Sequence, residues 1–108
     1  MGMAKSPMEI LLNRTFTPRE QEEMLREDME AELDAINLYS QQLSITAYDD
    51  VKKALEEIIY DEKTHFEIFR ELLEKHGTDE EKARKAAKRE LAKILKKNAS
   101  HDESQSED

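Results

Sequence analysis

The feature that most constrains this chain is a pair of apolar stripes with helical spacing, each interrupted by polar, titratable side chains. The first stripe lies in residues 17–46 and repeats at alternating intervals of four and three residues. Its members are Leu25, Met29, Glu32, Ile36, Tyr39 and Leu43. The second stripe lies in residues 50–76 and has the same spacing. Its members are Val51, Leu55, Ile58, Glu62, His65, Phe69 and Leu72. This period predicts two amphipathic α-helices.

Boundary signals delimit the first of these helices. Thr17 can cap its N-terminus, Pro18 stands where a missing N–H costs nothing, and Glu20 can complete a capping box. At about 1.5 Å per residue, a helix from there to residue 46 would be roughly 43 Å long, which is typical of helical bundles. Residues 46–50 are predicted to form the following turn, with an Asx cap within it.

A third, shorter helix is predicted after the second. Gly77 ends the second helix, and residues 78–81 repeat the capping-box pattern and open a helix to about Lys97. With two glycines, two prolines and 40% charged residues, the composition agrees with helical structure. The predicted fold is therefore all-α, an antiparallel two-helix hairpin with a shorter third helix.

Three segments follow from this division. Residues 17–97 are expected to form the helical domain. Residues 1–16 precede it as an arm, in which residues 8–12 carry an apolar cluster expected to dock on another surface. Residues 98–108 are polar and acidic without apolar anchors, so they are expected to be a disordered tail.

Composition and charge exclude several classes of protein. The chain has no cysteine, which leaves His, Asp and Glu as its good metal ligands. No apolar run approaches the roughly 18 residues of a membrane span, and no signal-peptide pattern is present, so a cytoplasmic protein without a membrane partner is expected. The net charge is −12 over residues 1–81 and +7 over residues 82–97. Because the basic segment lacks interleaved aromatic residues, an acidic neighbour is the expected partner rather than nucleic acid.

The polar members of the two stripes are the candidate site. Burying an unpaired carboxylate costs several kcal/mol, roughly, and the stripes contain no Lys or Arg to neutralise Glu32 and Glu62. His65 lies one turn from Glu62 and could pair with it, but Glu32 would then have no partner. A metal ion accounts for all three residues. The alternative is a structural polar cluster in a helical dimer.

A second copy of the chain would complete such a site. Two helices cannot enclose a core, whereas two hairpins packed about a two-fold axis make a four-helix bundle. That homodimer brings together two copies of Glu32 and two of the Glu62/His65 pair, which is the ligand set of carboxylate-bridged di-metal sites. Four carboxylates balance two divalent ions, and ligation by oxygen with one His per metal favours iron or manganese.

These residues carry a resemblance to a known family. The run from Glu30 to Tyr39, followed some 30 residues later by Asp61 to His65, resembles the ferritin-like superfamily, and in length most closely the encapsulated ferritins. The likeness covers roughly residues 10–97. It implies a ferroxidase with a di-iron centre at a dimer interface, two iron ions per dimer, dimers that associate into an annular decamer, and enclosure in an encapsulin nanocompartment. It also implies that Glu32, Glu62 and His65 are the ligands.

The sequence departs from this family in two places. Family members often place an acidic residue directly before the first ligand as part of an iron-access route, and here that position is Ala31, so Glu30 and Asp34 are the candidates for this role. The tail lacks the apolar peptide with which such cargo docks on its encapsulin shell, so the sequence does not support encapsulation: a shell would be engaged through another segment, such as residues 8–12, or would be absent. Tyr39, on the face of Glu32, is either a core residue or a hydrogen-bonding neighbour of the metals.

Two other functions use the same features. A rubrerythrin-like peroxidase would use the same ligands but would consume peroxide faster than oxygen. A non-enzymatic helical assembly module would bind no stoichiometric metal.

Overall fold

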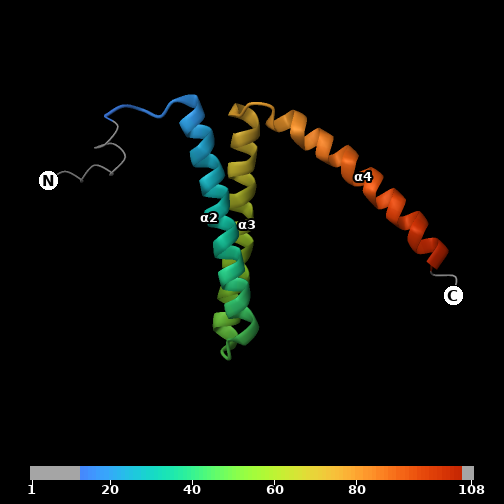
Figure 1. The fold of residues 1–108 in the computed structure, drawn as a ribbon. Coiled ribbons are helices and arrows are strands. Elements are labelled where there is room, and N and C mark those ends of the chain that lie inside the picture. Colours follow the sequence, from blue (N-terminus) through green and yellow to red (C-terminus); the bar gives the residue numbers. More distant parts are fainter. Residues whose placement is uncertain (1–12, 106–108) are drawn as a thin grey trace.

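The computed structural model describes residues 13–105, with side chains described to residue 97, and this part of the chain is all helical with short connections. Its elements are α2 (Pro18–Ile45), α3 (Asp49–His76) and α4 (Glu80–Gln105). Helices α2 and α3 lie side by side and antiparallel, while α4 points away from them (Figure 1). The predicted all-α hairpin with a third helix is confirmed. The apolar cluster predicted in residues 8–12 lies outside the described residues.

The start of α2 forms the predicted capping box. The Glu20 N–H donates to Thr17 Oγ1 over 3.2 Å, and the Thr17 N–H donates to Glu20 Oε1 over 2.9 Å. The Arg14 guanidinium also donates to both oxygens of Glu20, over 2.7 and 3.0 Å. This hydrogen bonding, first from Arg14 and then from the Thr17 backbone, lowers the pKa of Glu20 to about 2. The carboxylate therefore fixes the chain that leads into α2.

The turn between α2 and α3 is shorter than predicted. Thr46 is the extended C-cap of α2, and Tyr48 is the extended N-cap of α3 and makes no side-chain capping bond. The Asp50 carboxylate instead accepts from the next N–H, that of Val51, over 2.8 Å. The predicted Asx cap is thus replaced by an acidic side chain within the first turn, where it also suits the helix dipole.

Gly77 ends α3 for reasons of space. Its φ of −79° is ordinary, and its N–H donates to Leu73 O over 2.6 Å. A Cβ at this position would lie 2.5 Å from that same oxygen and would also meet the Glu80 side chain. Any larger residue here would force the end of α3 or the Glu80 side chain to shift.

The start and end of α4 differ from the prediction. Asp79, with a left-handed φ of 63°, directly precedes the helix, so Thr78 is not its N-cap and the predicted capping box there is wrong. The Thr78 N–H donates instead to Glu22 Oε1 of α2 over 3.0 Å. The helix ends at Gln105 rather than near Lys97, so it continues beyond the predicted boundary of the third helix. Residues 98–105 contain no Gly or Pro to stop the helix.

The core of the single chain is thin. Leu25, Leu55, Ile59 and Leu73 are its buried apolar residues, at 6–9% exposure, and no described side chain is fully buried. The radius of gyration is 20.6 Å, compared with about 13 Å for a compact chain of this length. A single chain therefore leaves much apolar surface uncovered, as the sequence predicted.

The predicted stripe of α3 is divided between two faces. Leu55 is buried with Ile59 and Leu73, whereas Val51, Ile58 and Leu72 are 39–40% exposed. The exposed three belong to a line with seven-residue spacing, and His65 occupies the remaining position of that line. One partner helix covers only one side of an amphipathic face. No helix in the described range is long and apolar enough to cross a membrane.

Candidate metal centre

The hairpin brings the three predicted ligands together. Glu32 on α2 and both Glu62 and His65 on α3 each offer one ligand atom, and these atoms all lie within 4.8 Å of one another. His65 Nδ1 is 3.7 Å from Glu32 Oε1 and 3.9 Å from Glu62 Oε2. Both distances exceed that of a hydrogen bond. The three side chains therefore converge, but His65 forms no hydrogen bond with either carboxylate.

The register of the hairpin explains this convergence. The short turn pairs Ile45 with Asp49 at one end, and in an antiparallel pair Glu32 then lies opposite Glu62, since both are 13 residues from these helix ends. His65 follows Glu62 by one helical turn and so lies on a neighbouring part of the same surface. The site is thus halfway along both helices, far from the fraying ends.

Burial differs among the three side chains. The Glu32 side chain is 15% exposed, that of Glu62 is 22% exposed, and that of His65 is 50% exposed. Glu32 Oε2 is a buried oxygen with no hydrogen-bond partner, the one such side-chain atom found among the described residues. Leaving a buried charged oxygen unpaired costs about 1–3 kcal/mol or more. The cluster therefore lacks a positively charged or donating group.

The chain itself does not supply that group. Within the described part of the chain, the only charged or titratable partner within ion-pair distance of Glu32 and Glu62 is His65. Two carboxylates and an imidazole match the donor set of a divalent iron or manganese ion. The orphaned Glu32 oxygen and this donor set fit a metal, and half of the His65 ring surface remains open for a further group.

The other predicted residues lie outside this cluster. Tyr39 is half-buried on α2, and Glu30 and Asp34 are exposed, as is Ala31. None of them belongs to the one group of potential metal ligands found in the described residues. Their roles as metal neighbour and iron-access residues stay predictions.

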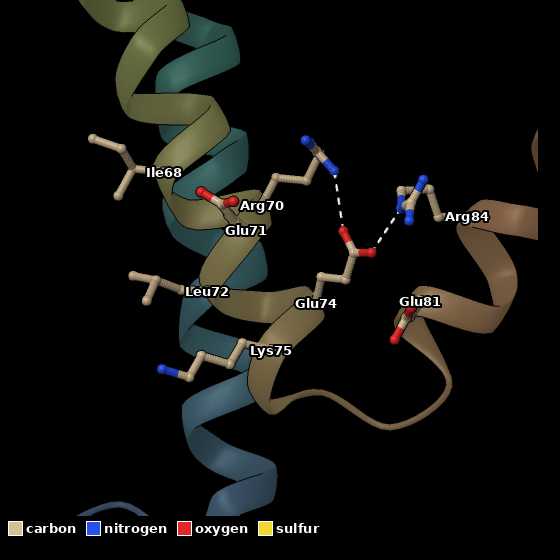
Figure 2. A pocket seen from close by; sticks show the side chains of 8 residues that line it. All are labelled: Ile68, Arg70, Glu71, Leu72, Glu74, Lys75, Glu81 and Arg84. Atoms are coloured by element: carbon tan, nitrogen blue, oxygen red, sulfur yellow. Dashed lines mark hydrogen bonds and ion pairs between the residues drawn. The ribbon is translucent and has the colours of Figure 1, made fainter.

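A second charged cluster was not predicted from sequence. At the junction of α3 and α4, Glu74 accepts from Arg84 Nε over 2.6 Å and from Arg70 Nη1 over 3.3 Å (Figure 2). These side chains line an open groove with Ile68 and Leu72 at its apolar side. We call Arg70, Glu74 and Arg84 the elbow cluster. In the sequence they look like ordinary surface charges, because nothing in their spacing signals a contact between two helices.

Comparisons with known proteins agree with this geometry. A family model described as "Ubiquinone biosynthesis protein COQ7" matches residues 19–94. The encapsulin nanocompartment cargo protein EncC of Myxococcus xanthus (strain DK1622) is 34% identical over 97 residues, which cover 90% of this chain and 74% of that protein. The crystal structure of an encapsulated ferritin domain from Pyrococcus furiosus superposes with a TM-score of 0.76 and 31% sequence identity. This match covers 86% of this chain and 95% of that domain.

Proposed function

Because this chain belongs to the encapsulated ferritins, a ferritin-like family related to COQ7, we propose that it is a ferroxidase that oxidises Fe(II) to Fe(III). The observation that carries the proposal is the convergence of Glu32, Glu62 and His65 around a carboxylate oxygen that has no partner among the described residues. Iron is the substrate, and each ion gives up one electron. Dioxygen or peroxide takes the electrons.

The chain's own residues would hold and shelter the iron. Glu32 and Glu62 supply negative charge that stabilises both oxidation states, with Fe(III) favoured more strongly, and His65 adds a neutral nitrogen. The low exposure of the two carboxylates limits competition from water. Manganese fits the same donors, but it would serve as a resident ion rather than as the substrate.

A homodimer would complete the centre. One chain supplies three ligands, and the line of Val51, Ile58 and Leu72 around His65 is an exposed apolar surface of the kind that a partner covers. Two chains would bring four carboxylates to two divalent ions, so the two Fe(II) per dimer would be neutralised. Glu30 and Asp34 would attract iron towards this interface, and Tyr39 would border it.

Family membership supports further assembly and enclosure. EncC is described as cargo of an encapsulin nanocompartment. We infer that dimers of the present chain assemble into an annular decamer inside an encapsulin shell in the cytoplasm. An open chain of this size encloses no mineral by itself, so a shell would receive the Fe(III).

Aerobic addition of Fe(II) tests the ferroxidase. Formation of Fe(III) is followed by its absorbance in wild type, Glu32→Ala and His65→Ala, with Glu57→Ala as a matched control on an exposed part of α3. We expect fast oxidation in wild type and in the control, and loss in the two ligand variants. Equal rates in all four proteins would remove the assigned centre. Repeating the measurement with peroxide under nitrogen separates an oxygen-using ferroxidase from a peroxidase.

A further inference from the structure

Helix α4 leaves the hairpin at an angle without burying an apolar side chain against it. None of the described side chains of α4 is buried, and Leu91, Ile94 and Leu95 are 51–56% exposed. Figure 1 shows α4 running away from α2 and α3 over most of its length. The angle between two helices is normally fixed by interdigitated side chains along a shared face. The direction of α4 must therefore be set at its junction with the hairpin.

On the α3 side of this junction, the contacts to α4 are charged. Glu74 accepts from Arg84 Nε of α4 over 2.6 Å and from Arg70 Nη1 over 3.3 Å (Figure 2). The side chains of Glu74 and Arg84 are 21% and 45% exposed, so water and salt reach this ion pair. Ion pairs of this kind contribute little each and weaken as the ionic strength rises.

On the α2 side, charged residues hold both the linker and the first turn of α4. The Glu22 carboxylate accepts from the Thr78 N–H over 3.0 Å. Arg26 Nη2 lies 3.8 Å from Glu22 Oε1 and 3.8 Å from Glu80 Oε1 of α4. The start of α4 is thus tied to both helices of the hairpin by charge. We call these six side chains the charge lock: Glu22, Arg26, Arg70, Glu74, Glu80 and Arg84.

The linker between α3 and α4 has three residues, 77–79, and one of them has an unusual backbone conformation. Asp79 has a left-handed φ of 63°. Residues other than glycine rarely adopt this conformation, and it persists where the surrounding contacts hold it. The Asp79 carbonyl accepts from the Ala83 N–H over 2.8 Å, so Asp79 is joined to the first turn of α4. A change in the Asp79 dihedral angles would therefore redirect the whole helix.

We propose that residues 77–79 are a hinge held by the charge lock, and that α4 swings as one helix when salt or a change of charge opens this lock. Residues 80–105 contain no Gly or Pro at which the helix would bend instead. The swing would redirect the exposed stripe of Leu91, Ile94 and Leu95, so the lock would decide which surfaces the stripe can reach. Because the metal centre lies halfway along the hairpin, the hinge does not depend on the proposed function.

The distance between a label on the hairpin and a label on α4 tests the hinge. The chain has no cysteine, so Ser40→Cys on α2 and Lys93→Cys on α4 place two nitroxide labels at exposed positions. Labelled chain is mixed with an excess of unlabelled chain, so that each measured pair of labels belongs to one molecule. Pulsed electron paramagnetic resonance then gives the distribution of distances between the two labels.

Charge reversal at Arg84 is the variant that opens the lock. We expect a narrow distribution of distances in the doubly labelled wild type at low salt. In Arg84→Glu, which sets a carboxylate against Glu74, we expect one at least about twice as wide, because the linker dihedral angles are then free to change. Lys85→Glu is the matched control, since it makes the same change of charge but its ion pair, at 3.0 Å, is with Glu81 of α4 itself. Combining Glu74→Arg with Arg84→Glu restores opposite charges and should narrow the distribution again.

Salt and helix content complete the test. At about 1 M salt the Debye length falls to about 3 Å, so the wild-type distribution should widen to that of Arg84→Glu. A distribution that is as narrow in Arg84→Glu as in wild type, or as wide in Lys85→Glu as in Arg84→Glu, overturns the lock. Circular dichroism should give the same helix content for all the variants. A loss of helix in Arg84→Glu would mean that α4 unwinds rather than swings, and would contradict the hinge.

Discussion

Glu62 and Glu74 lie on the same helix with nearly the same side-chain exposure, 22% and 21%, but in opposite electrostatic surroundings. Glu74 has an arginine on each side, at 2.6 and 3.3 Å. In the described part of the chain, the one ion-pair partner of Glu62 is His65, at 3.9 Å, and Glu62 faces a second carboxylate across the hairpin. A half-buried carboxylate that the chain neutralises itself is structural, whereas one that the chain leaves unmatched is available to a cation from outside.

The largest expected effect is a difference in iron-oxidation rate between a variant of Glu62 and a variant of Glu74. Glu62→Gln removes a proposed metal ligand and half of the negative charge that one chain offers to the site, so we expect iron oxidation to fall about 100-fold or more. Glu74→Gln changes the same chemical group in the elbow cluster and should leave the rate per dimer close to that of wild type. Initial rates of Fe(III) formation at equal dimer concentration provide the measurement. Equal losses in both variants would mean that the contrast between the two clusters has no functional meaning.

The next largest effect concerns the exposed apolar line of Val51, Ile58 and Leu72 beside His65, where we expect a second chain to pack. Ile58→Arg places a charge in the exposed apolar line beside His65, and burying it unpaired costs about 3 kcal/mol or more, enough to weaken a dimer about 100-fold. We expect monomers and a loss of iron oxidation, although Glu62 and His65 are intact. Sedimentation gives the mass and absorbance gives the rate. Glu56→Arg, on another face of α3, is the control, and a monomeric variant that still oxidises iron at the wild-type rate would show that one chain suffices.

The convergence of Glu32, Glu62 and His65 could be predicted from sequence, whereas the elbow cluster could not. Glu32, Glu62 and His65 interrupt apolar stripes, so the low exposure of the two carboxylates and the shared face of all three residues follow from helical periodicity. Val51, Ile58 and Leu72 belong to the same stripe but are exposed, because two helices cover only part of a face. The length of α4 depended on the absence of a stop signal, and its direction depends on contacts between distant surface charges, which periodicity does not reveal.

A smaller effect, of opposite sign at the two clusters, should appear in the free energy of unfolding without metal. Glu32→Gln removes a buried charge whose Oε2 has no partner, so we expect the metal-free protein to gain about 1 kcal/mol. Glu74→Gln removes the negative charge and one of the two oxygens that accept from Arg70 and Arg84, and should lose about 0.5–1 kcal/mol. Urea unfolding in the presence of a chelator, at one fixed protein concentration, measures both. If Glu32→Gln destabilises the metal-free protein, the Glu32 carboxylate has a structural partner. The proposed contrast between Glu32 and Glu74 would then be wrong.

The smallest expected effect is a pH dependence of stability that comes from Glu20. Like Glu74, Glu20 is a carboxylate that forms an ion pair with an arginine of its own chain. The Arg14 hydrogen bonds hold the pKa of Glu20 at about 2 in the folded protein, against an ordinary value of 4.5. A depressed pKa contributes stability that is present above the unfolded value, and this stability is lost as the pH falls from 4.5 towards 2. Wild type should therefore lose its stability advantage over Glu20→Gln across this window, while the difference in stability between them stays constant above about pH 6.

Thermal unfolding of both proteins from pH 7 down to pH 2.5 measures this difference. Glu23→Gln is the control, because its arginine contact is longer, at 3.4 Å, and its side chain is more exposed. A Glu20 variant whose difference from wild type does not change between pH 6 and pH 3 would show that the Arg14 contact does not persist in solution. Glu20 would then resemble the unmatched carboxylates Glu32 and Glu62 more than Glu74 of the elbow cluster.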